Sequence, residues 1–483
     1  MIHAQLSPEA QARLNAQKRN STISSMVISV LFVVMIFLVL GIFLLPNIIK
    51  TTPEIVAYTA AVTEENHVSV KKVNNTIQRK PSAPSSSMTK VIAANTVSPT
   101  AIPVPVIDVV TPNADFGDGE NFGGAWGDVA DSSSGAAGFA GIPATMRSRC
   151  SKEDRMARLK STGGTAEGEE AVIKSLEWLK KNQKPDGSWD NSHPVAMTGF
   201  AILVFLGHCE TPLSEEYGET VLKGITYLVN VGLKNDGRIT SKKIANIQWV
   251  YDHSIATYAL AESYTFCKTL SVKIPDLDTV TKKAGDIIMA GQADSGGWLY
   301  KYAPSATDGD NSVGFWQIQA LKACKHTDLW PESKFKPTIR KALAWLDKIQ
   351  GKDGSIGYHG NSAINPGLTG GGVLAFQMWD EGRSRSATHG VKYIVENSDF
   401  KWGDPNSNLY YHYYNAQAMI NHGGKEWDDY NNRFRDELIK AQNPDGSWAK
   451  LAGVKGPVNS HMATCLATLM LEVYYRFLPG SAK

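Results

Sequence analysis

A two-part unit repeats six times along this 483-residue chain, from Thr165 to the C-terminal region. The first part is an amphipathic stretch that ends in a polar turn. Its fullest form reads Lys-small-x2-aromatic-aliphatic-x3-Gln-x3-Gly-x-Trp. The aromatic and aliphatic positions fall five and four residues before the Gln, on one stripe of a helix. Recurrence of such a unit predicts a repeat architecture in which each unit packs against the next.

The polar turn is kept to different degrees in the six units. The second unit, from Lys223 to Ile239, lacks the Gln, and the fifth, from His389 to Asp404, is eroded. Four units keep the Gln and three of these also keep the Trp. The conserved positions of this motif are Gln183, Trp189, Gln292, Trp298, Gln350, Gln442 and Trp448.

The second part of each unit is more apolar and rich in small residues. These stretches cover residues 192–206, 252–264, 311–324, 367–379, 411–420 and 460–475. A helix that is apolar around most of its circumference is buried, whereas an amphipathic helix keeps one face in water. We therefore predict an all-α fold, an (α/α)6 toroid with six inner and six outer helices, spanning about 165–478 within a domain that runs to residue 483.

The N-terminal region predicts a membrane anchor. Residues 26–45 are uncharged and mostly apolar, long enough to cross a bilayer core as a helix. Arg13, Lys18 and Arg19 precede this stretch, and the positive-inside rule then places residues 1–25 in the cytoplasm. A cleaved signal peptide is the alternative, but its apolar region would be unusually long. We predict a single-pass signal anchor over 26–48, with everything after it outside the cytoplasm.

Between the anchor and the repeats, composition changes. Residues 49–144 are rich in Pro, Ser and Gly, which predicts a flexible linker. The lead-in segment 145–164 carries a basic run over 146–160, interpreted as a solvated helix face. The five cysteines are far apart and form no Cys-x-x-Cys pair, which argues against a zinc ribbon or a dense disulfide framework. The net charge of +2, with no basic stripe, makes nucleic acid an unexpected partner.

The repeated turns resemble the QW repeats of squalene–hopene and oxidosqualene cyclases. The six-fold helix pairing is also similar to that of protein prenyltransferase β subunits and complement thioester domains. The resemblance implies that the Gln and Trp are structural and tie outer helices to neighbouring helix ends. With the absence of eukaryotic signals, it also implies a bacterial inner (cytoplasmic) membrane protein whose toroid is periplasmic.

The same resemblance supplies a candidate acid. The segment from Asp308 to Ser312, which opens the third inner stretch, resembles the Asp-x-Asp-Asp-Thr motif of class II terpene cyclases. Asp308 matches the first Asp, and Asp310 matches the central Asp that protonates an alkene or epoxide there. That reaction needs a protonated carboxyl made acidic by its hydrogen bonds. Asn311 and Ser312 depart from the motif, and the other interpretation is a helix N-cap.

Histidines and aromatic residues predict a binding site at one end of the toroid. Four inner stretches carry a His six residues before a small residue, so these imidazoles are expected at the same end. They could form an acid–base or metal cluster, or each could bond a neighbouring loop. Aromatic residues near the same end could line an apolar pocket or belong to the core. The candidate binding residues are His193, His253, His412, His461, Tyr251, Trp316 and Tyr411.

No cofactor is expected. The resemblance makes His461 similar to a zinc-binding histidine of prenyltransferases, but the sequence has no Asp-x-Cys pair. The thioester sequence Gly-Cys-Gly-Glu-Gln is also absent. We therefore predict no metal and no thioester.

Two functions remain open. The first is a binding or scaffold module that holds a lipid, glycan or peptide at the concave end of the toroid. The second is a divergent isoprenoid cyclase or transferase with Asp310 as general acid. The absence of a catalytic triad, a metal motif and a complete cyclase acid favours the first, as does the presence of one toroid where triterpene cyclases have two.

Overall fold

The computed structural model of this protein describes residues 149–241, 249–360 and 366–476. Every element in these ranges is helical. The predicted cytoplasmic tail (1–25), membrane span (26–48) and linker (49–144) lie outside them. Within the described ranges no helix is long and apolar enough to cross a membrane.

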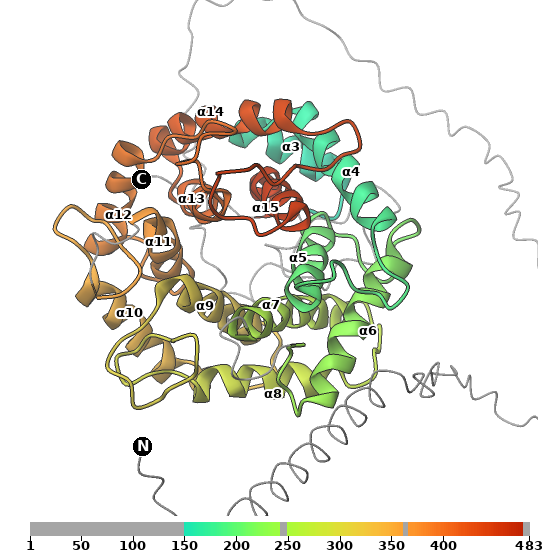
Figure 1. Ribbon diagram of the computed structural model, residues 1–483, viewed down its shortest axis with the longest axis horizontal. Helices are drawn as coiled ribbons and strands as arrows, with labels where there is room; N and C mark the ends of the chain where they lie inside the picture. The colour runs from blue at the N-terminus through green and yellow to red at the C-terminus, as the bar shows by residue number, and fades with distance from the viewer. Residues whose placement is uncertain (1–148, 242–248, 361–365, 477–483) are drawn as a thin grey trace, which may run out of the picture. The chain divides into compact units, whose positions relative to one another are not determined.

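Six helices of the described residues form a closed inner ring (Figure 1). Each packs against the next, and the last packs against the first. They are α5 (Pro194–Gly207), α7 (Trp249–Thr269), α9 (Asn311–Lys325), α11 (Thr369–Met378), α13 (Leu409–His422) and α15 (Ser460–Leu471). The predicted inner stretches overlap these helices, although α7 and α13 are longer at both ends than predicted and α15 ends at Leu471 and not at residue 475.

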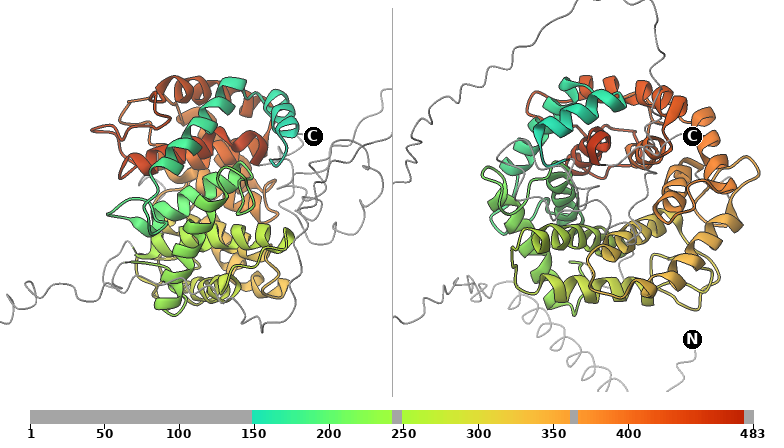
Figure 2. Two further views of the ribbon diagram at one scale, coloured as in Figure 1. Left: turned by 90° about the vertical axis from the view of Figure 1, so that its right-hand side faces the viewer. Right: turned by 180° about the vertical axis from the view of Figure 1, so that it is seen from behind.

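Six further helices of the described part form an outer ring around the first (Figures 1 and 2). They are α4 (Ala166–Lys181), α6 (Gly218–Lys234), α8 (Leu277–Ala290), α10 (Lys336–Ile349), α12 (Arg385–Asn397) and α14 (Gly424–Ala441). The contact between α14 and α4 closes this ring. The short elements are α3 (Lys152–Thr162), α16 (Val473–Arg476), and the 3-10 turns η3 (Glu332–Lys334) and η4 (Pro366–Leu368).

Burial separates the two rings as the sequence pattern predicts. In α5 every residue from Val195 to Gly207 is buried, because the helix is surrounded by others on all sides. In α10 the buried residues form one stripe that includes Ile339, Trp345 and Leu346, and the opposite face is solvated. The amphipathic and all-apolar patterns thus place each helix in its ring.

The repeated Gln fastens each polar turn to the next outer helix. Its amide Nε2 donates to the carbonyl of the turn glycine four residues later and to a carbonyl in the first or second turn of a neighbouring outer helix. The pairs with the neighbouring helix are Gln183 with Thr220 (2.9 Å), Gln292 with Thr338 (2.7 Å), Gln350 with Ser386 (2.9 Å) and Gln442 with Ala171 (2.7 Å). The last pair joins the sixth unit to the first and closes the toroid.

The Gly and Trp of the turn have separate structural roles. Gly446 has φ of +90°, and a Cβ there would clash with the backbone carbonyl of Lys174 in the neighbouring helix α4. Trp448 is buried and donates from its indole N–H to the Leu438 carbonyl at 2.9 Å. Trp189 and Trp298 make the same bond in their own units. The turn therefore needs these residue types for backbone geometry and packing.

The interpretation of the basic lead-in as a solvated face was wrong for two of its arginines. Arg149 and Arg155 are both buried. Arg155 donates from Nε to Glu169 of α4 at 2.8 Å, and Arg149 donates to Glu262 of α7 at 2.7 Å. A buried guanidinium needs a carboxylate partner, and these partners lie on other helices, beyond the reach of a local charge pattern.

Candidate functional site

A cavity of about 390 Å³ opens at the end of the inner ring where its helices begin, which we call the mouth. Residues at or just before the starts of five inner helices line it, so these five helices run in the same direction. These are His193 and Ala196 of α5, Tyr251 and Ile255 of α7, Ser312 and Trp316 of α9, Tyr410 and Tyr411 of α13, and Met462 of α15. The volume falls within the range of small-molecule sites.

Trp316 is the centre of the aromatic wall. Its indole stacks on Tyr413 with ring centroids 5.4 Å apart and meets Phe200 edge to face at 5.3 Å. It is fully buried against these rings while lining the cavity. Tyr358 and Tyr411 are half-buried and complete the wall. Rings held by their neighbours in this way present rigid apolar faces to the cavity.

The hydroxyl groups of Tyr251, Ser312 and Tyr410 in the wall are hydrogen-bonded within the protein. Tyr251 Oη lies 2.7 Å from Ser312 Oγ, and Ser312 Oγ donates to Asp310 Oδ1. Tyr410 Oη donates to the Ser312 carbonyl at 2.7 Å and accepts from Trp316 Nε1 at 2.6 Å. Most of the polar capacity of this wall is therefore used within the protein.

Asp310 lies behind this hydroxyl chain. It is the N-cap of α9, with Oδ1 accepting from the Ser312 backbone N–H at 2.9 Å. Burial raises the pKa of its carboxyl, and Oδ2 has no hydrogen-bond partner among the described residues. Ser312 lines the cavity, whereas Asp310 does not. Asp310 therefore caps α9, and the Ser312 side chain lies between its carboxyl and the cavity.

His359 is a neighbour of Asp310 that sequence reasoning missed. Its Nε2 lies 3.8 Å from Asp310 Oδ2, and its Nδ1 lies 2.9 Å from the Gly309 carbonyl and 3.6 Å from Asp308 Oδ2. Asp308 itself is exposed. The turn of the fourth unit brings His359 to the start of the third inner helix, so aligning the loops of adjacent units could have found it.

Asn311, which departs from the cyclase motif, belongs to the same junction. It donates from Nδ2 to the Gly357 carbonyl at 2.7 Å and accepts from the Trp345 indole at 3.0 Å. The amide therefore ties the start of α9 to the next unit, a role for which a carboxylate lacks the donor.

The structure does not bring the four predicted histidines together. Only His193 of the four lines the cavity. His253 faces outward, with Nε2 3.2 Å from the Ala284 carbonyl of α8, and burial lowers its pKa to about 3. His412 lies 2.7 Å from the Tyr430 hydroxyl of α14, and burial lowers its pKa to about 3. His461 packs on Trp178 of α4, with ring centroids 5.0 Å apart.

Four of the seven predicted binding residues do meet at one cavity. They are His193, Tyr251, Trp316 and Tyr411. Among the described residues no group of three His, Cys, Asp or Glu side chains is arranged to hold a metal ion.

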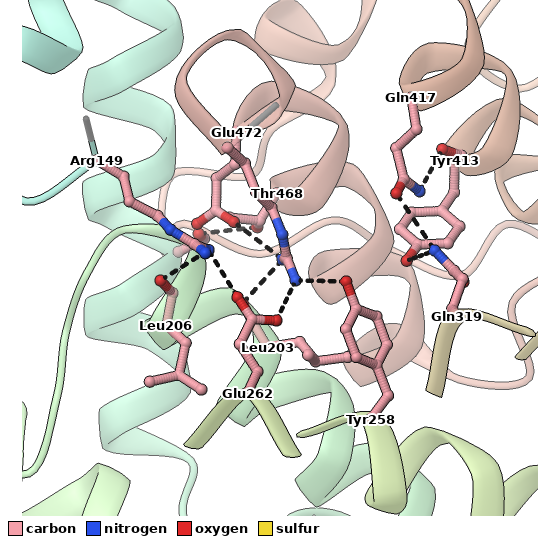
Figure 3. Close-up of polar contacts among 12 residues, drawn as sticks. Arg149, Leu203, Leu206, Tyr258, Glu262, Gln319, Tyr413, Gln417, Thr468 and Glu472 are labelled. Carbon is pink, nitrogen blue, oxygen red and sulfur yellow. Dashed lines mark hydrogen bonds and ion pairs between the residues drawn. The ribbon is translucent and has the colours of Figure 1, made fainter. Parts of the chain in front are cut away.

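The opposite end of the inner ring, which we call the base, holds a buried ionic cluster (Figure 3). Glu262 accepts from Arg149 at 2.7 Å and from Arg476 at 2.9 Å. Arg476 also donates to Tyr258 Oη at 3.1 Å and to the Leu203 carbonyl at 3.0 Å. Burial alone would raise the pKa of Glu262, but the two guanidinium groups outweigh it and lower that pKa.

Glu472 is the unusual member of this cluster. It is fully buried, and neither carboxylate oxygen has a hydrogen-bond partner among the described residues. The nearest cation is Arg476, whose Nη1 lies 3.9 Å away. Burial raises the pKa of Glu472 well above its ordinary value. Burial therefore favours the neutral form of this carboxyl.

A disulfide closes the base covalently. Cys150, beside Arg149, is bonded to Cys209 at the end of α5. The remaining cysteines of the described ranges, Cys267, Cys324 and Cys465, are buried thiols. A second cavity, of about 320 Å³, lies at the α7–α8 connection and is lined by residues that include Tyr264 and Lys268.

No family model matches this chain, and no curated protein matches it. The arrangement of helices is similar to that of solved toroids with little sequence identity. The GH76A α-1,6-mannanase of Salegentibacter is 13% identical with a TM-score of 0.48, covering 64% of this chain and 98% of its own. The type II terpene cyclase MstE of Scytonema is 10% identical with a TM-score of 0.43, covering 64% and 97%. A protein from Actinoplanes is 12% identical with a TM-score of 0.42, covering 64% and 99%. At these values the likeness says nothing about the chemistry of the mouth.

Proposed function

We propose that this protein is a ligand-binding module whose mouth takes up a small molecule with an apolar body. The carrying observation is the cavity of about 390 Å³ with its rigid aromatic wall. Ligand pockets of this size are lined mainly by apolar and aromatic side chains with a few polar groups. Ala196, Ile255 and Met462 extend the apolar lining beyond the aromatic rings.

The hydrogen bonding of the wall favours a lipid-like ligand over a glycan or a peptide. A sugar or a peptide backbone needs donors and acceptors that are free to pair with it, because unpaired polar groups are costly to bury. The hydroxyls of Ser312 and Tyr410 are already paired inside the protein. The aromatic and aliphatic faces remain, and these match an apolar chain or ring.

We place this module outside the cytoplasm, anchored by the predicted helix over 26–48. The Cys150–Cys209 disulfide supports this location, since such bonds form and persist in oxidising compartments. The predicted linker over 49–144 would give the toroid reach from the membrane. Epitope accessibility in intact and permeabilised cells tests this topology.

An enzyme that uses Asp310 is the second candidate. The observation in its favour is the hydrogen-bonded series from Tyr251 through Ser312 to Asp310, which connects the cavity with a carboxyl of raised pKa. Against it, a general acid must come within hydrogen-bond reach of the atom that it protonates. Asp310 lies behind Ser312, so we favour the binding module.

Equilibrium dialysis of radiolabelled decanol against the full-length protein in amphipol tests the proposal. We expect saturable binding of one molecule per chain above an amphipol-only blank. Ala196→Trp should fill the cavity and abolish this binding, while Ala166→Trp, at an exposed position of α4, should leave it intact. Circular dichroism checks that both variants fold. Absence of saturable binding, or equal binding by the Ala196→Trp variant, would refute the proposed function.

A further inference from the structure

We infer that the mouth selects molecules whose apolar body ends in an anionic head group, and that Lys455 contacts this group. The inference rests on the proposed function, because it names the class of ligand for the same cavity. It depends on a segment that no motif singled out, the connection over 449–459 between the last polar turn and α15.

This connection forms one edge of the cavity. Lys455, Gly456 and Val458 all line it. Val458 is 47% exposed although it is apolar, so its side chain is available to contact a molecule that enters the mouth. Together these residues put a cation and an apolar surface next to each other at the opening.

Close packing fixes the position of this edge. Gly456 has φ of +114°, and a Cβ there would clash with the side-chain oxygen of Asn408. Asn408 is the N-cap of α13 and accepts from the Tyr410 backbone N–H at 2.9 Å. Lys455 is therefore joined to a backbone that is seated on the same helix start that supplies Tyr410 and Tyr411 to the wall.

The charge of Lys455 is available to a ligand. Its side chain is exposed, and no carboxylate of the described residues forms an ion pair with it. Behind it, the hydroxyls of Ser312 and Tyr410 are paired within the protein. A molecule with an apolar body in the cavity would thus present its terminal group to a cation in contact with water, which favours a carboxylate or a phosphate.

Asp252, the acidic residue of the described lining, does not reverse this selection. It is 1% exposed and accepts from Thr240 Oγ1 at 2.8 Å. It also lies in the first turn of α7, where the helix dipole favours a negative charge. A cationic head group would lie beside Lys455, and the carboxylate of the described lining is buried and already hydrogen-bonded.

The test compares decanoate, decyl phosphate and decanol at pH 8, with the full-length protein in amphipol and the same dialysis assay. Lys455→Met should weaken decanoate about three- to fivefold, the upper half of the range that an exposed ion pair contributes. It should weaken decyl phosphate more, because that head group carries more charge. Decanol binding should stay within about 1.5-fold of wild type, because decanol carries no charge and forms no ion pair that the substitution could remove. The added affinity of the anions should also fall with salt in the wild type.

Lys450→Met is the matched control, because Lys450 is exposed on the same connection but does not line the cavity. It should leave all three affinities unchanged. Equal loss of anion binding in the two variants, or no loss in Lys455→Met, would overturn the role of Lys455. Loss confined to one anion would identify the head group as carboxylate or phosphate. Failure of decanol itself to bind would instead count against the proposed function.

Discussion

At the base of the inner ring, Glu262 holds two buried guanidinium groups, and a disulfide fastens the segment that carries one of them. At the mouth, the Tyr251 hydroxyl bonds to the Ser312 hydroxyl, and the Tyr410 hydroxyl donates to the Ser312 backbone carbonyl, beside a cavity. The same helices supply both ends. At the base the charges of Glu262 and its two arginines are paired and buried, whereas at the mouth aromatic faces border an opening.

This difference indicates which end is available to a ligand. At the base, Glu262 already accepts from two guanidinium groups, and removing one partner would leave an unpaired buried charge. At the mouth the hydroxyls of Ser312 and Tyr410 are paired within the protein, so an apolar body can occupy the cavity without breaking these bonds. The comparison predicts that substitutions at the base change stability, and those at the mouth change binding.

Breaking the base should have the largest effect. Glu262→Ala leaves Arg149 and Arg476 without their shared carboxylate, and we expect a loss of about 3–5 kcal/mol in the free energy of unfolding. Urea unfolding at pH 7, followed by circular dichroism, measures it. Glu219→Ala removes an exposed pair with Lys223 and should cost less than about 1 kcal/mol. Equal small losses in both variants would mean that the cluster does not hold the base together.

The pH dependence of stability provides a second test of the base, through Glu472. Its pKa in the folded state is raised, so between the ordinary value near 4.3 and the folded value the native protein keeps a proton that the unfolded chain has released. Stability contributed by this group is therefore present at low pH and falls as pH rises, by up to about 1.4 kcal/mol per pH unit in that window. Glu472→Gln should remove this loss, so its stability relative to wild type should rise from pH 5 to pH 7.

Urea unfolding of both proteins at each pH measures that difference. The titrations of Glu262 and Glu169 should largely cancel, because they are present in wild type and variant alike. Glu396→Gln, on an exposed part of α12, is the matched surface control. A difference between Glu472→Gln and wild type that stays constant with pH would mean that Glu472 is ionised in the folded protein.

At the mouth, Tyr411→Ala should reduce binding far more than stability. The half-buried ring lines the cavity, and loss of one aromatic contact corresponds to about tenfold in affinity. Dialysis with decanol measures the affinity, and urea unfolding should change by no more than about 1 kcal/mol. Tyr393→Ala, a half-buried ring on α12, should leave the affinity intact. Equal affinities of the two variants would remove Tyr411 from the site.

Asp310→Asn should have the smallest effect on binding. Asn is as good an N-cap as Asp, and the carboxyl does not line the cavity, so decanol affinity should stay within about twofold. The raised pKa of Asp310 means that its contribution to stability falls as pH rises past its ordinary value, and the variant should lose that dependence. Conversion of a supplied lipid by wild type but not by this variant, seen by mass spectrometry, would favour the enzyme.

The ring of helices was largely predictable because its signals are local. Periodicity assigns α10 to the outer layer and α5 to the inner one, and each polar turn repeats nearly unchanged. Four residues of the mouth were predictable for the same reason. Inner helices that begin at the same end of the ring bring the residues of their first turns to that end. Which way each side chain points was not predictable: His253 and Trp316 both lie in the first two turns, but one faces α8 and the other the cavity.

The base was not predictable from the sequence. Arg149 pairs with Glu262 across 113 positions, and Arg476 pairs with it across 214. Neither arginine stands in a motif, and a basic run is normally solvated. Such pairs exist only because closure of the ring brings the two ends of the domain together. The same applies to His359, which reaches Asp310 through contact between adjacent units.

Photoaffinity mapping tests the central claim, that the mouth is the binding site, most directly. The full-length protein would be illuminated with a diazirine derivative of decanoate and the labelled peptides identified by mass spectrometry. We expect label on residues 251–255, 410–411 and 455–462, which excess decanoate removes. Label concentrated on 264–278 around the second cavity, or spread evenly over the outer helices, would contradict the assignment of the mouth as the site.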